Sequence, residues 1–266
     1  MKRSTLLTAF AVLLVAASGL QSCKSQYDVI LESTDLDLKY KAAFDYFNAG
    51  KYARSAAVFE SLTLLTNGTE RHDTVLYYLG LSNYSFKDYY TAETNFDQYL
   101  SNFPQGAFAE TADFLRIDCL YRSTLRYELD QTPTYTAITA MGEYLRAHPT
   151  GANADILRHR MEELGERLDR KAYESAKLYY KMEDYKAARV ALRNVLKEDA
   201  DNVYREDILY YTAMASYKFA EMSVPSKQKE RFLVFQDDYL NFVGEYPESS
   251  YRKELDGLYN KVKEKN

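Results

Sequence analysis

The sequence predicts an all-α protein, a right-handed superhelical solenoid of about five helix pairs with a C-terminal capping helix. The first observation is a helical pattern that recurs three times and ends each time at a proline, namely Pro104, Pro149 and Pro247. In each copy an aromatic residue stands five positions before the proline, and a large side chain stands three positions before that aromatic. The second observation is that 266 residues hold only 5 prolines and 10 glycines, and that the prolines fall between the periodic segments. Helix-breaking residues placed in this way indicate many short helices.

The first 22 residues form a predicted targeting segment. Lys2 and Arg3 give it a positive start, and residues 6–17 are almost entirely apolar. A spanning helix needs about 20 apolar residues, so this shorter core is typical of a secretory signal that is removed. We therefore expect residues 1–22 to be a signal peptide.

A cysteine follows this segment in the box Leu20-Gln21-Ser22-Cys23, which resembles the cleavage box of bacterial lipoproteins. The resemblance implies that Cys23 becomes the acylated first residue, modified with palmitate and held in the outer-membrane lipid. The alternative is an ordinary signal peptide with a chance cysteine. Residues 23–34 are polar and weakly patterned, so we expect a lipid-anchored tether there. No long acidic run follows Cys23, which favours a location facing the periplasm.

From residue 35 to residue 266 the apolar periodicity predicts successive antiparallel helix pairs. Short polar turns separate the two helices of a pair, except for a longer linker at 127–133. The expected pairs are 37–49 with 53–65, 74–86 with 91–102, about 107–125 with 134–147, 172–182 with 185–197, and 205–222 with 227–245. A closing helix, from 249 to about 264, is predicted to cap the array, because terminal repeats need a polar outer face.

The first two pairs resemble the tetratricopeptide repeat, a 34-residue helix–turn–helix unit. The second pair supplies the Leu-Gly of the first helix at Gly80, the turn aromatic at Tyr89 and the second-helix phenylalanine at Phe96. Residues of the same kind occur 37 positions earlier, at Ala43, Tyr52 and Phe59. A small residue lets two helices approach closely, and a ring fills the space between neighbouring pairs.

Composition and motifs argue against chemistry at a catalytic centre. The formal net charge of −5 gives no basic field for nucleic acid. The three histidines, His72, His148 and His159, are not spaced as metal ligands, and the glycines form no phosphate-binding loop. Cys119 lies in an apolar helical stretch and is expected to be a packed core thiol. We therefore expect no enzyme activity, no metal and no cofactor.

The 26 tyrosines and 13 phenylalanines are the informative side chains. Taking Ala43 and Gly80 as reference points, the register predicts a client-peptide groove formed by Tyr40, Phe44, Phe47, Tyr77, Leu81 and Tyr84. The alternative is that these rings only pack against the tether or one another. In the fourth pair the same register predicts a basic partner-docking face formed by Tyr173, Lys177, Tyr180 and Lys181.

The whole arrangement resembles the BamD family of outer-membrane lipoproteins. The resemblance rests on Cys23, on the repeated helix–proline pattern and on late segments such as Val224-Pro225-Ser226-Lys227 and Glu245-Tyr246-Pro247-Glu248-Ser249, which are similar to Bacteroidetes members. It implies a non-enzymatic subunit of the β-barrel assembly machinery that docks on a BamA-like barrel subunit. Its N-terminal repeats are then expected to help receive and insert unfolded outer-membrane proteins.

Two other kinds of protein fit the same sequence. One is a periplasmic tetratricopeptide scaffold lipoprotein that organises cell-wall or division enzymes. The other is a glycan-binding lipoprotein with similar repeats. Proteins of that kind usually stack sugars on tryptophan, and this chain has none, so the glycan-binding alternative is the weaker of the two.

Overall fold

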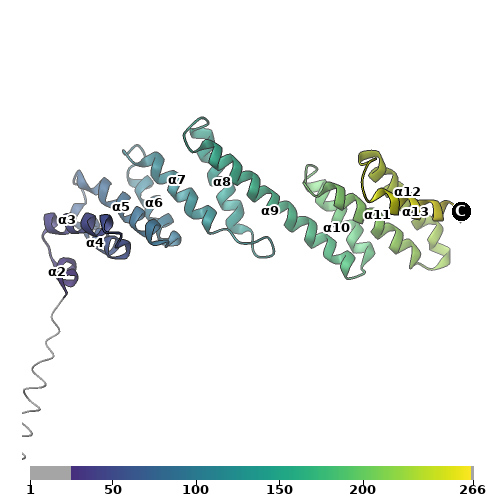
Figure 1. Ribbon diagram of the computed structural model, residues 1–266, viewed down its shortest axis with the longest axis horizontal. Coiled ribbons are helices and arrows are strands. Elements are labelled where there is room, and N and C mark those ends of the chain that lie inside the picture. Colours follow the sequence, from purple (N-terminus) through teal and green to yellow (C-terminus); the bar gives the residue numbers. More distant parts are fainter. Residues whose placement is uncertain (1–24, 265–266) are drawn as a thin grey trace, which may run out of the picture. The chain divides into compact units, whose positions relative to one another are not determined.

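The computed structural model describes residues 25–264, which form twelve α-helices and no strand (Figure 1). The predicted all-helical fold is therefore confirmed. The described residues divide into two compact units, unit 1 ending at Arg122 and unit 2 beginning at Ser123. Within this part of the chain, no helix combines the length and the apolar character needed to cross a membrane. The predicted signal peptide and Cys23 lie outside the described residues, and the handedness of the array stays a prediction.

Unit 1 contains two of the predicted helix pairs, each helix packing on the next one along the chain. The predicted helix positions are confirmed to within a few residues. Its helices are α2 (Gln26–Glu32), α3 (Leu36–Asn48), α4 (Tyr52–Thr66), α5 (Arg71–Phe86), α6 (Tyr89–Asn102) and α7 (Ala109–Arg122).

The segment expected to be a polar tether contains the short helix α2. Ser25 caps it, because the Ser25 side chain accepts a hydrogen bond from the Asp28 backbone N–H while the Asp28 carboxylate accepts one from the Ser25 N–H. Ile30 is buried against the first helix pair, and the Arg54 guanidinium lies 5.2 Å from the centre of the Tyr27 ring. The packed domain therefore begins near residue 25, ten residues before the predicted boundary. Two helical turns are too short to show a periodic pattern in sequence.

The small residues of the first two pairs are explained by close packing. A Cβ placed on Gly80 would lie 2.8 Å from ring atoms of Phe96, so only glycine lets the fully buried ring approach α5 this closely. Ser55, which departs from the repeat pattern, is accommodated by hydrogen bonds. Its hydroxyl lies 3.0 Å from the Ala43 carbonyl oxygen and 3.0 Å from the Ser82 hydroxyl, so the buried polar groups satisfy one another.

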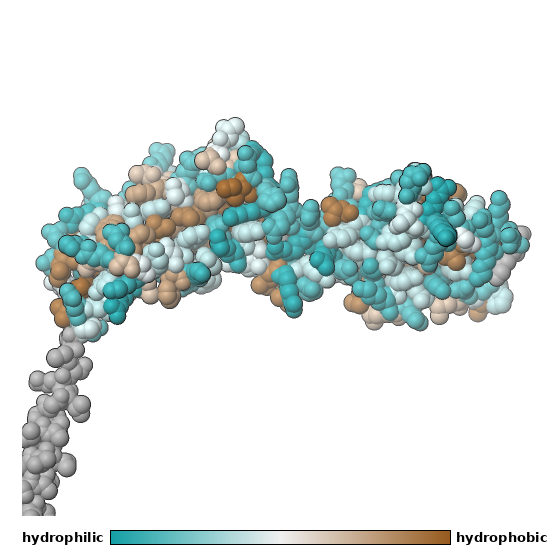
Figure 2. Space-filling view, viewed as in Figure 1, coloured by the Kyte–Doolittle hydropathy of each residue, from teal (hydrophilic) through white to brown (hydrophobic). Residues whose placement is uncertain are grey.

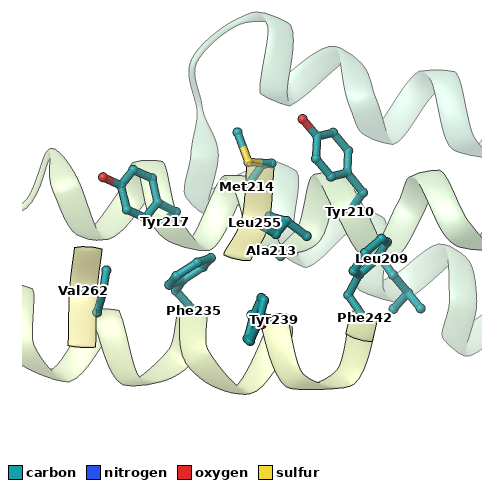
Figure 3. Close-up of a cluster of buried hydrophobic side chains, with 10 residues drawn as sticks. All are labelled: Leu209, Tyr210, Ala213, Met214, Tyr217, Phe235, Tyr239, Phe242, Leu255 and Val262. Atoms are coloured by element: carbon teal, nitrogen blue, oxygen red, sulfur yellow. The ribbon is translucent and has the colours of Figure 1, made fainter. Parts of the chain in front are cut away.

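Unit 2 is built around a cluster of buried side chains from α11, α12 and α13 (Figure 3). Phe235 and Phe242 of α12 are fully buried, and Leu255 and Val262 of α13 cover them, as expected of a capping helix. The helices are α8 (Thr132–Ala147), α9 (Ala154–Lys181), α10 (Tyr185–Glu198), α11 (Arg205–Glu221), α12 (Pro225–Glu245) and α13 (Arg252–Lys263).

The predicted third pair is not one packing unit, because α7 belongs to unit 1 whereas α8 belongs to unit 2 and packs on α9. The linker between them is clamped to α9. The Lys171 ammonium donates to the carbonyl oxygens of Tyr127 and Leu129 at 3.1 and 2.8 Å, and Arg167 donates to Leu125. The linker is therefore long because part of it packs along α9 and is bound to it.

Helix α9 is much longer than predicted, since it starts at Ala154 instead of 172. In the added part only Ala154, Leu157 and Leu164 are buried, and charged residues occupy most other positions. So narrow an apolar stripe gives only a weak helical periodicity in the sequence, although it is wide enough for α8 to pack on it.

Candidate binding surfaces

The α3 part of the predicted groove is a row of half-buried rings. The ring centres of Tyr40 and Phe44 are 5.1 Å apart. Phe44 and Phe47 both meet the ring of Tyr78 edge-on, at 4.7 and 5.3 Å. Edge-to-face contacts at these distances stabilise aromatic pairs beyond their area burial. Tyr78 of α5 is thus the common neighbour of Phe44 and Phe47, and Tyr40 joins them through its contact with Phe44.

Tyr77 of α5 does not belong to an exposed groove. Its side chain is buried at 7% exposure, and its ring stacks on Phe108 at a centre distance of 4.2 Å. The prediction that Tyr77 faces a peptide is therefore wrong, because the segment before α7 covers it. Leu81, one turn further along α5, is half-buried beside the same cluster.

Tyr84 is half-buried and held by a charged pair. Its hydroxyl donates to the Asp118 carboxylate at 2.7 Å. Asp118 also forms an ion pair with Arg122, whose guanidinium lies 5.1 Å from the centre of the Tyr89 ring. Burial first, and then the hydrogen bond to Asp118, raise the pKa of Tyr84 to about 12.

Five of the six predicted groove residues thus keep partial exposure, and apolar surface gathers on the N-terminal side of the chain (Figure 2). We define the aromatic row as Tyr40, Phe44, Phe47, Tyr78, Leu81 and Tyr84. Sequence reasoning missed Tyr78, because its role depends on rings from two other helices. A signal was nevertheless present, since Tyr78 forms an aromatic pair with Tyr77 in the sequence.

Hydrogen-bonded and buried tyrosines predict a pH dependence of stability. Burial is the largest cause that raises the pKa of Tyr84, Tyr99, Tyr180 and Tyr239 from 10.0 to about 12. The folded protein holds these protons more tightly than the unfolded chain, so their contribution is complete below pH 10 and is lost as the pH rises toward 12. We expect the melting temperature, followed by circular dichroism, to fall across this interval. Tyrosinate absorbance of the folded protein that titrates in one step near pH 10 would contradict this expectation.

One residue of the predicted docking face on α9 is interior, and a second, Lys177, is half-buried beside it. Tyr173 is only 3% exposed, and its ring stacks on Tyr204 at 5.0 Å. The Lys177 ammonium lies 2.7 Å from the Tyr173 hydroxyl and 4.4 Å from the centre of the Tyr211 ring. The prediction that Tyr173 is a contact residue is therefore wrong, because Tyr204, just before α11, and Tyr211 of α11 pack on it.

The other two predicted residues remain nearer the surface. Tyr180 is half-buried with its ring centre 5.2 Å from that of Tyr211. Lys181 is exposed, and its ammonium lies 3.1 Å from the Glu174 carboxylate. A docking role for Tyr180 and Lys181 stays a prediction.

A polar cleft of about 630 Å³ between α10, α11 and α12 was not predicted. Two ion pairs cross it. Arg189 binds Asp238 through two hydrogen bonds of 2.6 and 3.1 Å, and Arg205 binds Glu245 at 2.7 and 2.9 Å. These partners are 40 or more positions apart, so the sequence pattern could not pair them. The first ion pair ties α10 to α12, and the second ties α11 to α12.

The described residues contain no group of three or more histidine, cysteine or acidic side chains able to hold a metal ion. Cys119 is fully buried, and burial raises the pKa of its thiol to about 12. A thiol in that environment stays protonated, so it is a core side chain and a poor nucleophile.

The fold is that of a helical-repeat protein. The chain belongs to the YfiO family of outer membrane lipoproteins, whose family model matches residues 33–233. No curated protein matches the chain.

Among solved structures, the chain is similar to a tetratricopeptide-repeat protein from Bacteroides fragilis, with 17% identity and a TM-score of 0.40. That match covers 88% of this chain and 100% of the other. The chain is also similar to the TPR2AB domain of yeast Sti1, solved as a complex with pHSP90, with 15% identity and a TM-score of 0.41. Here the match covers 86% of this chain and 98% of the other.

Proposed function

We propose that this protein is a non-enzymatic lipoprotein subunit of the β-barrel assembly machinery. In this role it docks on a BamA-like barrel subunit and helps receive and insert unfolded outer-membrane proteins. The observation that carries the proposal is membership of the YfiO family over residues 33–233, which include the whole aromatic row and the α10 and α11 walls of the cleft in unit 2. Helical repeats commonly present such surfaces to other polypeptides.

The proposed location is the periplasmic side of the outer membrane, with the acyl chains of Cys23 in the lipid. Family membership supports the association with the outer membrane. The cleavage box around Cys23 supports the anchor, and the absence of a long acidic run after it supports the periplasmic side. Multiple acyl chains give a stable anchor, since each buried methylene contributes about 0.8 kcal/mol.

The aromatic row is the proposed receiving site for clients. An aromatic side chain from an extended peptide would meet half-buried rings that are already held in place by one another. Such a preorganised site binds at a low cost in conformational entropy. The hydroxyls of Tyr40 and Tyr78 add hydrogen-bonding groups to the row.

The test of the function is purification of tagged full-length protein from detergent-solubilised envelopes. Stoichiometric recovery of a BamA-like barrel protein is the expected result. Recovery of cell-wall or division enzymes without that barrel protein would overturn the proposal in favour of a scaffold lipoprotein. Depletion of the protein provides a second readout, because loss of several unrelated barrel proteins from the outer membrane is expected only of an assembly subunit.

The receiving site has its own test, in which Tyr40→Ala is combined with Phe47→Ala. We expect the affinity for a synthetic peptide ending in an aromatic residue to fall about tenfold or more, because two ring contacts are removed. The measurement is a fluorescence-anisotropy titration with labelled peptide.

The matched control combines Phe86→Ala with Tyr90→Ala. These two aromatics lie in the same unit, are 56% and 82% exposed, and are outside the row. The control should bind peptide as the parent protein does, and circular dichroism should show the same helical content in both variants. Equal affinity of the two double variants would rule out the aromatic row as the receiving site.

A further inference from the structure

An open apolar groove of about 730 Å³ lies between α9 and α10, inside unit 2. Of the ten side chains along it, only Glu198 carries a charge at neutral pH. The α9 side consists of Ala172, Ser175, Ala176, Leu178, Tyr179 and Met182, and the α10 side consists of Ala191, Asn194, Val195 and Glu198.

Large apolar side chains line this groove without being covered. Leu178 is 52% exposed, Tyr179 is 45% exposed and Met182 is 67% exposed. All three lie within a turn and a half of α9, so their exposed surfaces are contiguous along one side of the helix. A contiguous apolar patch beside a groove is typical of an interaction site.

The repeat register shows what covers the equivalent surface elsewhere. Ala176 occupies the small-residue position of its pair, as Gly80 does in the second pair, so Leu178 corresponds to Ser82. Ser82 is fully buried, and its hydroxyl lies 3.0 Å from that of Ser55 on the preceding helix α4. The face of the first helix that a preceding helix covers in unit 1 is therefore bare on α9.

Helix α8 and the linker before it pack on the first part of α9, and the groove begins where these contacts end. Buried residues of the earlier part of α9 pack with α8, and the linker before α8 is held by Lys171 through the carbonyl oxygens of Tyr127 and Leu129. Ala172, the next residue, is the first residue of the groove. In a regular stack of helices, another helix would cover this surface of α9, and no helix of unit 2 does so. Two neighbouring helices present ridges and grooves that suit a third helix.

Carboxylates without basic partners gather at one end of this groove. Glu198 lines the groove, Asp199 follows it, and Asp169 and Glu166 lie on α9 just before Ala172. None of the four forms an ion pair among residues 25–264. The Asp169 carboxylate instead accepts a hydrogen bond from the Val203 backbone N–H at 3.0 Å. Burial first, and then the nearby Asp199 carboxyl, raise the pKa of Asp169.

The nearest cations along α9 are engaged in other contacts. The Arg170 guanidinium stacks on the ring of Tyr127 at 4.4 Å, and Lys171 is bound to linker carbonyl oxygens. The acidic end therefore carries a negative potential that a basic residue of a partner would neutralise.

We propose that the groove between α9 and α10 docks an amphipathic α-helix supplied by a second protein. The apolar face of that helix lies on Leu178, Tyr179 and Met182. Its lysine or arginine residues lie at the end beside Glu198. This surface is separate from the aromatic row, and the inference holds whether or not the row receives clients.

Site-specific photocrosslinking of the full-length protein in its own envelope tests the occupant. The photoreactive residue p-benzoylphenylalanine replaces Leu178 in one strain and Val190 in a matched control. Val190 is also 52% exposed but is not part of the groove. We expect a crosslink from position 178 and not from position 190. Peptide mapping should place it on an amphipathic helix of another protein whose basic residues lie toward Glu198.

The other occupants give different products, and each would overturn the proposal. A crosslink to this chain itself would identify either a second copy or an internal cover. A crosslink to lipid alone, to a segment without helical amphipathicity, or equally from both positions would remove the helix-docking assignment. The absence of any product at position 178 would mean that the groove is not occupied.

The mapped segment then serves as a synthetic peptide for a charge test on purified protein. Glu198→Gln combined with Glu166→Gln should weaken binding about five- to tenfold at low salt, and the difference should shrink at high salt. Glu183→Gln is the control, because Glu183 is an exposed carboxylate in the turn at the other end of the groove. An equal effect of both changes would show that the acidic end does not orient the helix.

Discussion

Phe96→Ala is expected to destabilise the protein by about 3–5 kcal/mol, the usual cost of removing a buried phenylalanine. The ring is fully buried between α5 and α6 and fits against Gly80, where even one methyl group would collide with it. The backbone around Gly80 is held by both helices, so it cannot collapse onto the vacated volume. A large cavity term is therefore added to the lost transfer free energy.

Urea unfolding followed by circular dichroism at 222 nm measures this change. Tyr90→Ala on the same helix is the control, since Tyr90 is 82% exposed and its removal should change the free energy of unfolding by less than about 0.5 kcal/mol. If the two units unfold in separate steps, the loss should appear in the step assigned to unit 1. A cost for Phe96→Ala close to that of Tyr90→Ala would mean that the ring is not part of the core.

Asp238→Ala is expected to cost about 2–3 kcal/mol in unit 2. The carboxylate binds Arg189 of α10 with two hydrogen bonds and also accepts one from the Ser216 hydroxyl of α11. Removing it leaves a partly buried guanidinium without its partner. The cost should stay below the ~3–5 kcal/mol of a fully buried pair, because the Arg189 side chain is still 24% exposed and reaches water.

Asp237→Ala is the matched control for this prediction, because the neighbouring carboxylate is exposed and has no ion pair among the described residues. Thermal and urea unfolding should separate the two variants clearly. Replacing both Arg189 and Asp238 by leucine should cost less than Asp238→Ala alone, since no buried charge is then left unpaired. If Asp237→Ala and Asp238→Ala are equally destabilising, the network does not link the helices energetically.

The helix pairs could be predicted because their signals are local. Periodic apolar residues, a small residue opposite a ring and a proline after the second helix all lie within about 40 positions. The pairs containing Gly80 with Phe96 and Ala176 with Leu192 were found in this way, and both small residues are buried as expected.

The surfaces were harder to predict, because exposure depends on distant segments. Tyr77 and Tyr173 have groove-facing positions in the register, yet each is covered by a ring outside its own helix pair, Phe108 in one case and Tyr204 in the other. Leu178 corresponds in the register to Ser82, which is covered in unit 1. Only the structure shows that nothing in unit 2 covers Leu178. Periodicity therefore predicts which way a side chain points, and tertiary packing decides whether it meets solvent.

The packing of α2 determines how far the repeats can move from a lipid attached at Cys23. A fully extended chain spans at most about 3.5 Å per residue, so a free tether over 23–34 would allow an excursion of about 40 Å. Because folded structure already begins at the Ser25 cap, only about 7 Å of chain separates that cap from Cys23. The first helix pair of an acylated protein would then be held close to the bilayer surface by this short connection. Partners of unit 1 would have to reach it near that surface.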